Sequence, residues 1–160
     1  MILLIVALLF VNFPQQTPTS QISESQRKQF IELLGTLPHK GEFFTDEAVR
    51  TAAPYLPVLL ALTDKDIEGL DIYPFAALSR ALCNVKENRV YATNHFGEIQ
   101  HPELKLAWAT MLFDSGNSSS EIVRYLKAAL KSEAQAKSLA EMAGPNFKDL
   151  KRRILATHEN

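Results

Sequence analysis

Hydrophobic residues recur at three- and four-residue steps along most of the chain, a spacing typical of amphipathic helices. The clearest succession lies in residues 45–131, where each apolar stripe is followed by a short polar break. Helices are predicted there over residues 45–62, 74–84, 102–115 and 118–131. The pattern therefore favours an all-α protein.

Residues with strong positional preferences mark the ends of these segments. Thr45 is the expected N-cap of the first helix, and Pro54 inside it predicts a kink because proline removes a backbone donor. Gly116 is the expected C-terminal cap of the third helix. The run 118–121 (Ser-Ser-Ser-Glu) predicts a capping box at the start of the fourth.

Helices are also predicted on both sides of this central part. Ser23 and Gln26 are spaced as a capping box, and the helix that they open is bounded by Gly35. An alanine-rich helix is expected over residues 133–143, and Asn146 is the expected cap of a last helix. The first of these helices is expected to cover the N-terminal end of the stack.

Two of the predicted helices share a sequence pattern. Residues 74–82 align with residues 104–112 at a constant offset, so that Ala77 meets Ala107 and Leu82 meets Leu112. A small residue lets two helix backbones approach, and the leucine fills the layer between them. Such an offset indicates a stacked helical repeat.

Residues 58–66 followed by 74–82 resemble the helix–turn–helix unit of HEAT-like repeats of the PBS-lyase type. Residues 101–112 look like a second inner helix, and residues 121–130 like the next outer one. The resemblance implies a short right-handed α-α superhelix of HEAT-like helical hairpins, with residues 85–100 as an insertion between repeats. The alternative is an irregular helical bundle.

The composition is typical of a globular protein with one hydrophobic core. The chain has 160 residues, of which 46% are hydrophobic and 22% charged, and its formal net charge is −1. This length suits a single domain, expected over residues 22–160, and the near-neutral charge does not favour nucleic-acid binding.

Residues 1–13 are almost wholly apolar, but they are too few to span a membrane as a helix. They are typical of a signal peptide, with residues 14–21 as a flexible spacer. The expected location is therefore outside the cytoplasm, periplasmic or secreted, with tethering by the N-terminal segment if it is not cleaved. The alternative is that residues 1–13 form a buried first helix.

The most enzyme-like group is His95, Glu98 and His101, which could ligate zinc. Their spacing does not match the metalloprotease pattern, and His101 is the expected cap of the helix that begins at Pro102. Cys83 lies among apolar helical positions and is expected to be buried. No catalytic residue, metal or cofactor is therefore predicted, and the chain is not expected to be an enzyme.

Residues 85–100 combine aromatic and charged side chains, which suits contacts with another protein. The predicted partner-binding residues are Arg89, Tyr91, Asn94, His95 and Phe96. The alternative is that Val90, Tyr91 and Phe96 fold back to cover the gap between repeats, as a short hairpin.

These observations favour a non-catalytic protein-binding scaffold or adaptor, part of an exported protein. Its partner, another protein, would bind on a concave face or on residues 85–100. One alternative is a metal-assisted hydrolase or lyase that uses the loop with His95, Glu98 and His101, since HEAT-like repeats also occur in proteins resembling phycobilin lyases. Another is a fragment of a longer helical solenoid.

Overall fold

The computed structural model describes residues 21–40 and 43–158, most of which are helical. The α-helices are α1 (Glu24–Leu34), α2 (Asp46–Ala52), α3 (Leu56–Leu60), α4 (Asp64–Ile67), α5 (Tyr73–Cys83), α6 (Lys86–Asn94), α7 (Pro102–Asp114), α8 (Ser120–Lys131), α9 (Glu133–Ala143) and α10 (Phe147–Ala156). Short 3₁₀ turns lie at η3 (Ala53–Tyr55), η4 (Phe96–Glu98) and η5 (Gly144–Asn146). The expectation of an all-α protein is confirmed for these residues.

A two-stranded sheet is the other regular structure within residues 21–40 and 43–158. Strands β1 (His39–Lys40) and β2 (Phe43–Phe44) pair in antiparallel register, with His39 opposite Phe44. The predicted signal peptide and most of the predicted spacer lie outside the described residues. Within those residues, none of the helices has the length and apolar character needed to cross a membrane.

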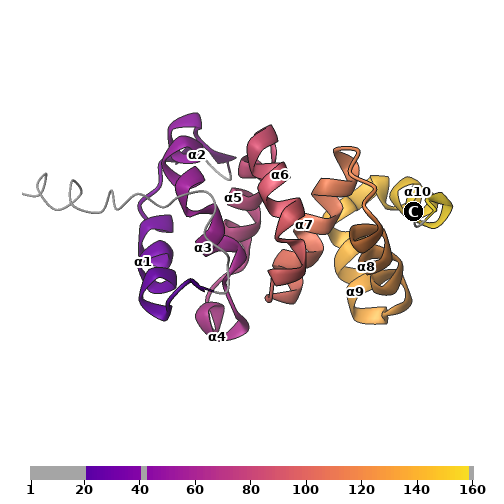
Figure 1. Ribbon diagram of the computed structural model, residues 1–160, viewed down its shortest axis with the longest axis horizontal. Coiled ribbons are helices and arrows are strands. Elements are labelled where there is room, and N and C mark those ends of the chain that lie inside the picture. Colours follow the sequence, from indigo (N-terminus) through magenta and orange to yellow (C-terminus); the bar gives the residue numbers. More distant parts are fainter. Residues whose placement is uncertain (1–20, 41–42, 159–160) are drawn as a thin grey trace, which may run out of the picture.

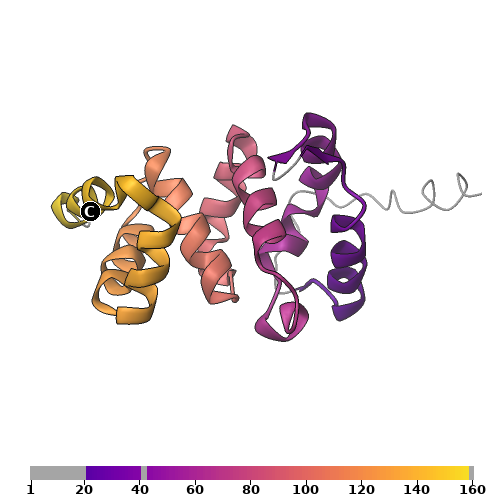
Figure 2. The same cartoon turned by 180° about the vertical axis from the view of Figure 1, so that it is seen from behind.

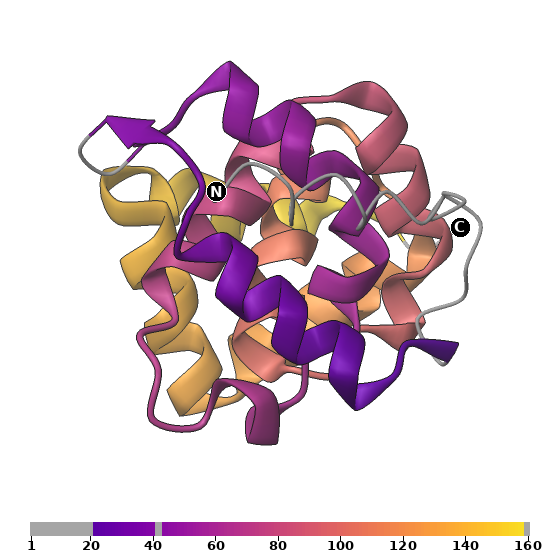
Figure 3. The ribbon, with the colours of Figure 1, turned by 90° about the vertical axis from the view of Figure 1, so that its left-hand side faces the viewer.

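The helices form an elongated row with α1 at one end and α10 at the other (Figure 1). Helices α5, α7 and α9 succeed one another along the row, since α7 packs against both α5 and α9. Helix α6 packs against α5 and α7, and α8 packs against α7 and α9. The same row is seen from behind in Figure 2, and Figure 3 shows α1 crossing its N-terminal end. We call the side of the molecule formed by α5, α7 and α9 the inner face.

Several predicted helix ends are confirmed. Ser23 and Gln26 form a reciprocal capping box, and the Thr45 hydroxyl accepts from the Ala48 N–H at 3.2 Å. The first central helix is broken where Pro54 lies, because α2 passes into η3 before α3 begins. His101 caps α7, its Nδ1 accepting from the Leu104 N–H at 3.5 Å.

The predicted capping box at residues 118–121 is wrong. Helix α8 has Ser119 in the cap position, and no side chain there makes a capping hydrogen bond. Instead, the Asn117 side chain accepts from the Ser119 N–H at 3.0 Å and donates to the Thr93 hydroxyl at 2.7 Å. The turn is therefore held by a contact with α6, which lies 24 residues earlier in the chain. Gly116 precedes it with a φ of +91°, a conformation that favours glycine, as predicted.

The interpretation of residues 85–100 as a short hairpin is also wrong, because the segment forms helix α6 and the turn η4. The buried positions of α6 are Asn88 and Ala92, one polar and one small, so the helix has no leucine stripe for a pattern search to find. Helix α6 packs against both α5 and α7.

The core is one continuous hydrophobic cluster that extends from Ile22 to Ile154. Trp108 on α7 is fully buried at its centre. Leu82 and Leu112, the two leucines of the predicted repeat, are both fully buried, in helices that pack against each other. Ala107 is buried, whereas Ala77 is half-buried.

Candidate functional site

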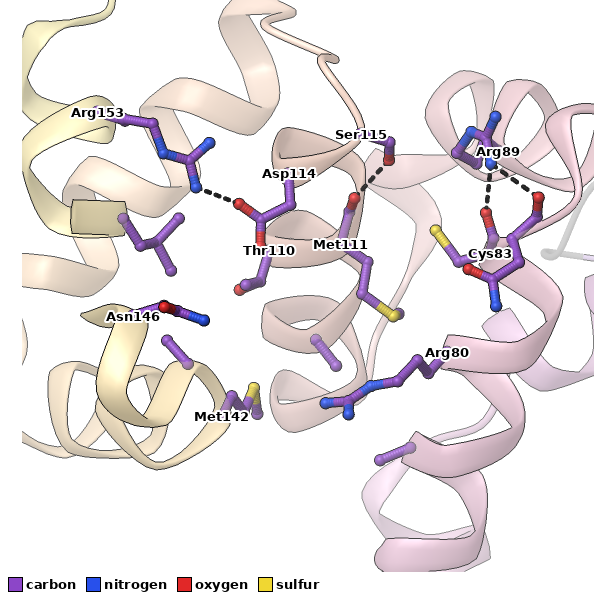
Figure 4. A pocket seen from close by; sticks show the side chains of 15 residues that line it. Arg80, Cys83, Arg89, Thr110, Met111, Asp114, Ser115, Met142, Asn146 and Arg153 are labelled. Carbon is purple, nitrogen blue, oxygen red and sulfur yellow. Dashed lines mark hydrogen bonds and ion pairs between the residues drawn. The ribbon is translucent and has the colours of Figure 1, made fainter. Parts of the chain in front are cut away.

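A groove of about 450 Å³ lies on the inner face, and we call it the inner groove. Residues of α5, α7, α9, η5 and α10 line it, together with Arg89 from α6 (Figure 4). Its size falls within the usual range for binding clefts of proteins.

Small and flexible side chains explain why this part of the inner face is hollow. Ala76, Ala107 and Ala143 stand on three successive helices of the inner face, and their short side chains leave space between the backbones. Met111 and Met142 line the groove beside them. Methionine is unbranched and polarizable, so these two side chains can adapt to an apolar partner.

Positive charge gathers on the wall formed by α5 and α6. Arg80 is exposed, and in Figure 4 it reaches from α5 toward the space beside Met111 and Met142. Arg80 forms no ion pair with any residue in 21–40 or 43–158. Arg89 donates to the carbonyl oxygens of Cys83 and Asn84, at 2.8 and 3.0 Å. Carbonyl acceptors hold the guanidinium in place but do not neutralise it.

The opposite wall is close to electrically neutral. Arg153 on α10 forms an ion pair with Asp114 on α7 and another with Asp149 on its own helix. The hydrogen bond with Asp114 is the largest cause that raises the pKa of Arg153 above its ordinary value, so this arginine is charged at every physiological pH. Arg153 thus joins α7 and α10, whereas Arg80 has no carboxylate partner among the described residues.

In comparisons with protein-family models, curated proteins and solved structures, no match to this chain was found. We therefore infer the function of the inner groove from its own geometry.

Cys83 lines the groove, and its side chain is buried as predicted. Burial raises the pKa of the Cys83 thiol, and the lowering effect of nearby Arg89 does not cancel it. The thiol therefore stays protonated at neutral pH, whereas nucleophilic cysteines act as thiolates. Cys83 contributes apolar surface to the groove.

Two of the predicted partner-binding residues lie at a surface hollow. Arg89 lines the inner groove and also a second, more open depression of about 390 Å³, which Asn94 shares. Val90 lies between them on α6 and is 52% exposed, so it does not fold back over the core. Arg89 joins the two hollows.

The other three predicted residues are engaged within the fold. The rings of Tyr91 and His95 stack with centroids 4.3 Å apart, and burial together with Glu98 raises the pKa of Tyr91 to about 12. Phe96 is 1% exposed and meets the ring of Tyr125 edge-on. Phe96 therefore belongs to the core and is not available to a partner. Tyr91 is partly buried against the same core, so these two residues agree with the fold-back interpretation and Val90 does not.

The three candidate metal ligands do not converge. His95 Nδ1 lies 2.9 Å from a carboxylate oxygen of Glu98, but His101 caps α7 and turns its Nε2 toward Asp64 at 3.6 Å. In the ranges 21–40 and 43–158, no group of three or more histidine, cysteine or acidic side chains is placed to hold a metal ion. His95 and Glu98 thus interact with each other after the end of α6, whereas His101 lies at the start of α7.

Sequence reasoning missed Arg80, Met111 and Met142. Arg80 stands in the last turn of α5, where a basic residue favourably meets the negative end of the helix dipole. The methionines occupy positions that fit an apolar stripe. Each residue alone has an ordinary role, and only the packing of α5, α7 and α9 brings the three together.

Proposed function

We propose that this chain is a non-catalytic helical-repeat scaffold that binds another protein in the inner groove. The observation that carries the proposal is the groove itself, a hollow with apolar and small side chains beside Arg80, which forms no ion pair within the described part of the chain. Partner-binding surfaces of this kind combine an apolar centre with charged groups that orient the partner.

The order of the helices supports a repeat architecture. Three consecutive pairs, α5/α6, α7/α8 and α9/α10, follow one another, and their first helices begin at Tyr73, Pro102 and Glu133, each about 30 residues after the last. In this interpretation α6 supplies the outer helix between the inner helices α5 and α7. We include in the proposal a short right-handed superhelix of HEAT-like hairpins, with the inner groove on its concave side.

Site-directed photo-crosslinking in the source organism tests the proposed function. Ala76 lines the inner groove, and Ala128 is an exposed residue of α8 outside the lining of the groove. Each is replaced in turn by benzoylphenylalanine, which forms covalent adducts with nearby chains on illumination. We expect position 76 to yield one partner protein, joined through one segment that mass spectrometry identifies.

Position 128 is the matched control, because the same reactive group is then exposed outside the inner groove. It should not yield that partner, and circular dichroism should show both variants to be folded. Equal adducts from both positions, or none from position 76, would remove the inner groove as the binding surface.

A further inference from the structure

We propose that the occupant of the inner groove is a segment of another protein in which a carboxylate is flanked by apolar side chains, and that Arg80 receives the carboxylate. This inference rests on the proposed function and adds the chemistry of the partner. Its basis is charge complementarity at a groove where apolar side chains lie beside Arg80.

The first step is the charge of the groove. Among its lining residues are three arginines, Arg80, Arg89 and Arg153, and one acidic residue, Asp114. Asp114 is already paired with Arg153, so the charge that a ligand meets is the positive charge of Arg80 and Arg89. A guanidinium can bind a carboxylate through two parallel hydrogen bonds, which gives both attraction and a defined orientation.

The second step is the apolar surface around Arg80. Met111 on α7 and Met142 on α9 are both partly exposed in the groove, and Ala76 and Ala107 form its recessed parts. Figure 4 shows Arg80 reaching into the same space as the two methionines. Apolar side chains on both sides of the ligand's carboxylate would fill this space and exclude water from the ion pair, which strengthens it.

The third step is the choice of a protein segment over a nucleic acid. A phosphate backbone is held by several cations at a regular spacing, whereas this groove presents one open arginine and one anchored arginine. On the far wall Arg153 is already paired with Asp114, so that wall offers no further cation for a second phosphate. The formal net charge of the whole chain, −1, adds no long-range attraction.

Binding of defined peptides to the full chain tests the inference. Three probes are short fluorescent peptides with the same leucine positions, whose polar positions are all glutamate, all glutamine or all lysine. The fourth probe is a single-stranded oligonucleotide. Fluorescence anisotropy at low salt measures the dissociation constants. We expect the glutamate peptide to bind about tenfold more tightly than the glutamine peptide, and added salt to reduce this difference.

Variants of the chain assign the effect to Arg80. Arg80→Ala should weaken binding of the glutamate peptide by about tenfold and leave the glutamine peptide unchanged, and Arg80→Lys should recover part of the loss. Arg50→Ala is the matched control, since Arg50 is an exposed arginine of α2 that does not line the groove. Met111→Ala should weaken the binding of both the glutamate and the glutamine peptide, because it removes apolar contact surface.

Four results would overturn the inference: equal binding of the glutamate and glutamine peptides, no binding of any peptide, equal losses from Arg80→Ala and Arg50→Ala, or tight oligonucleotide binding that requires Arg80. The crosslinked segment from position 76 separates this inference from the proposed function. If the crosslinked segment were neutral or basic, the proposed scaffold function would still hold, but the inference of an acidic partner would be contradicted. No adduct at all would remove both.

Discussion

At the scale of single residues, a largely buried ion pair links α1 to α4. Arg27 on α1 lies 2.8 Å from Asp66 on α4, and its guanidinium also donates to the Ile22 carbonyl. Asp66 in turn accepts hydrogen bonds from the backbone and the hydroxyl of Thr63, at 2.9 and 2.6 Å. One carboxylate thus both caps a helix and holds α1 beside it.

The protonation of Asp66 should therefore affect stability. Burial by itself raises the pKa of Asp66, but the hydrogen bonds from Thr63 and the ion pair with Arg27 outweigh it, so that the pKa in the folded chain lies below 3.8. A carboxyl group with a lowered pKa stabilises the fold at pH values above its ordinary pKa. That contribution disappears as the pH falls through the lowered value.

Asp66→Asn should reduce the free energy of unfolding at neutral pH by about 1–3 kcal/mol, because it leaves the largely buried Arg27 without its counter-charge. Urea unfolding followed by circular dichroism measures this loss. Between about pH 5 and pH 2, the stability of Asp66→Asn should also fall less steeply than that of the parent chain.

Asp64→Asn is the control, since Asp64 belongs to the same short helix and its side chain is 78% exposed. It should change the stability by less than about 0.5 kcal/mol. Equal losses from the two variants would show that the ion pair of Asp66 contributes nothing particular.

At the scale of elements, α6 shows how a helix with few apolar residues is held in a fold. Asn88, which is 2% exposed, donates to the Leu82 carbonyl at 3.0 Å. The Leu82 carbonyl also accepts from the Val85 N–H at 3.1 Å, and Arg89 donates to the next two carbonyls. Both side chains thus bond the backbone at the C-terminal end of α5. Side-chain hydrogen bonds to the backbone of α5 thus replace part of the hydrophobic contact that other helices use.

Asn88→Ala should lower the free energy of unfolding by about 0.5–1.5 kcal/mol, because it removes a buried hydrogen bond to the Leu82 carbonyl, which keeps its bond from the Val85 N–H. Asn94→Ala is the matched control, since Asn94 is exposed on the same helix and the change of intrinsic helix propensity is the same. It should alter stability by at most about 0.5 kcal/mol. Chemical denaturation measures both variants, and equal effects would contradict this role of Asn88.

At the scale of the whole molecule, one hydrophobic cluster links the helices from end to end. Repeat arrays can lose cooperativity as they lengthen, but a short array with a continuous core is expected to unfold as one unit. The single tryptophan, Trp108, lies fully buried at the middle of the row and reports on its centre.

Thermal unfolding should therefore give one transition, at the same midpoint by tryptophan fluorescence and by circular dichroism, which reports on every helix. Leu112→Ala should shift both signals together and cost about 2–5 kcal/mol, because Leu112 is fully buried in α7, at the middle of the row. Separate midpoints would show that the two ends of the row unfold independently.

The sequence predicted most of the fold because helix ends depend on neighbouring residues. The cap at Thr45, the break at Pro54 and the box formed by Ser23 and Gln26 each need only three or four residues in succession. The prediction failed where a helix end depends on distant contacts, as at Ser119, whose turn is held through Asn117 and Thr93. It failed for α6 because hydrogen bonds to another helix, invisible to periodicity, stabilise that segment.

By itself the sequence determined an all-α protein and the approximate limits of most of its helices, since apolar spacing and capping act within a few residues. Only the tertiary structure decided that residues 85–100 contain a packed helix, α6, and that His101 stands apart from His95 and Glu98. It also decided that Arg80, Met111 and Met142 share one groove. These three residues come from different helices, and their meeting depends on the relative placement of α5, α7 and α9, which no local pattern specifies.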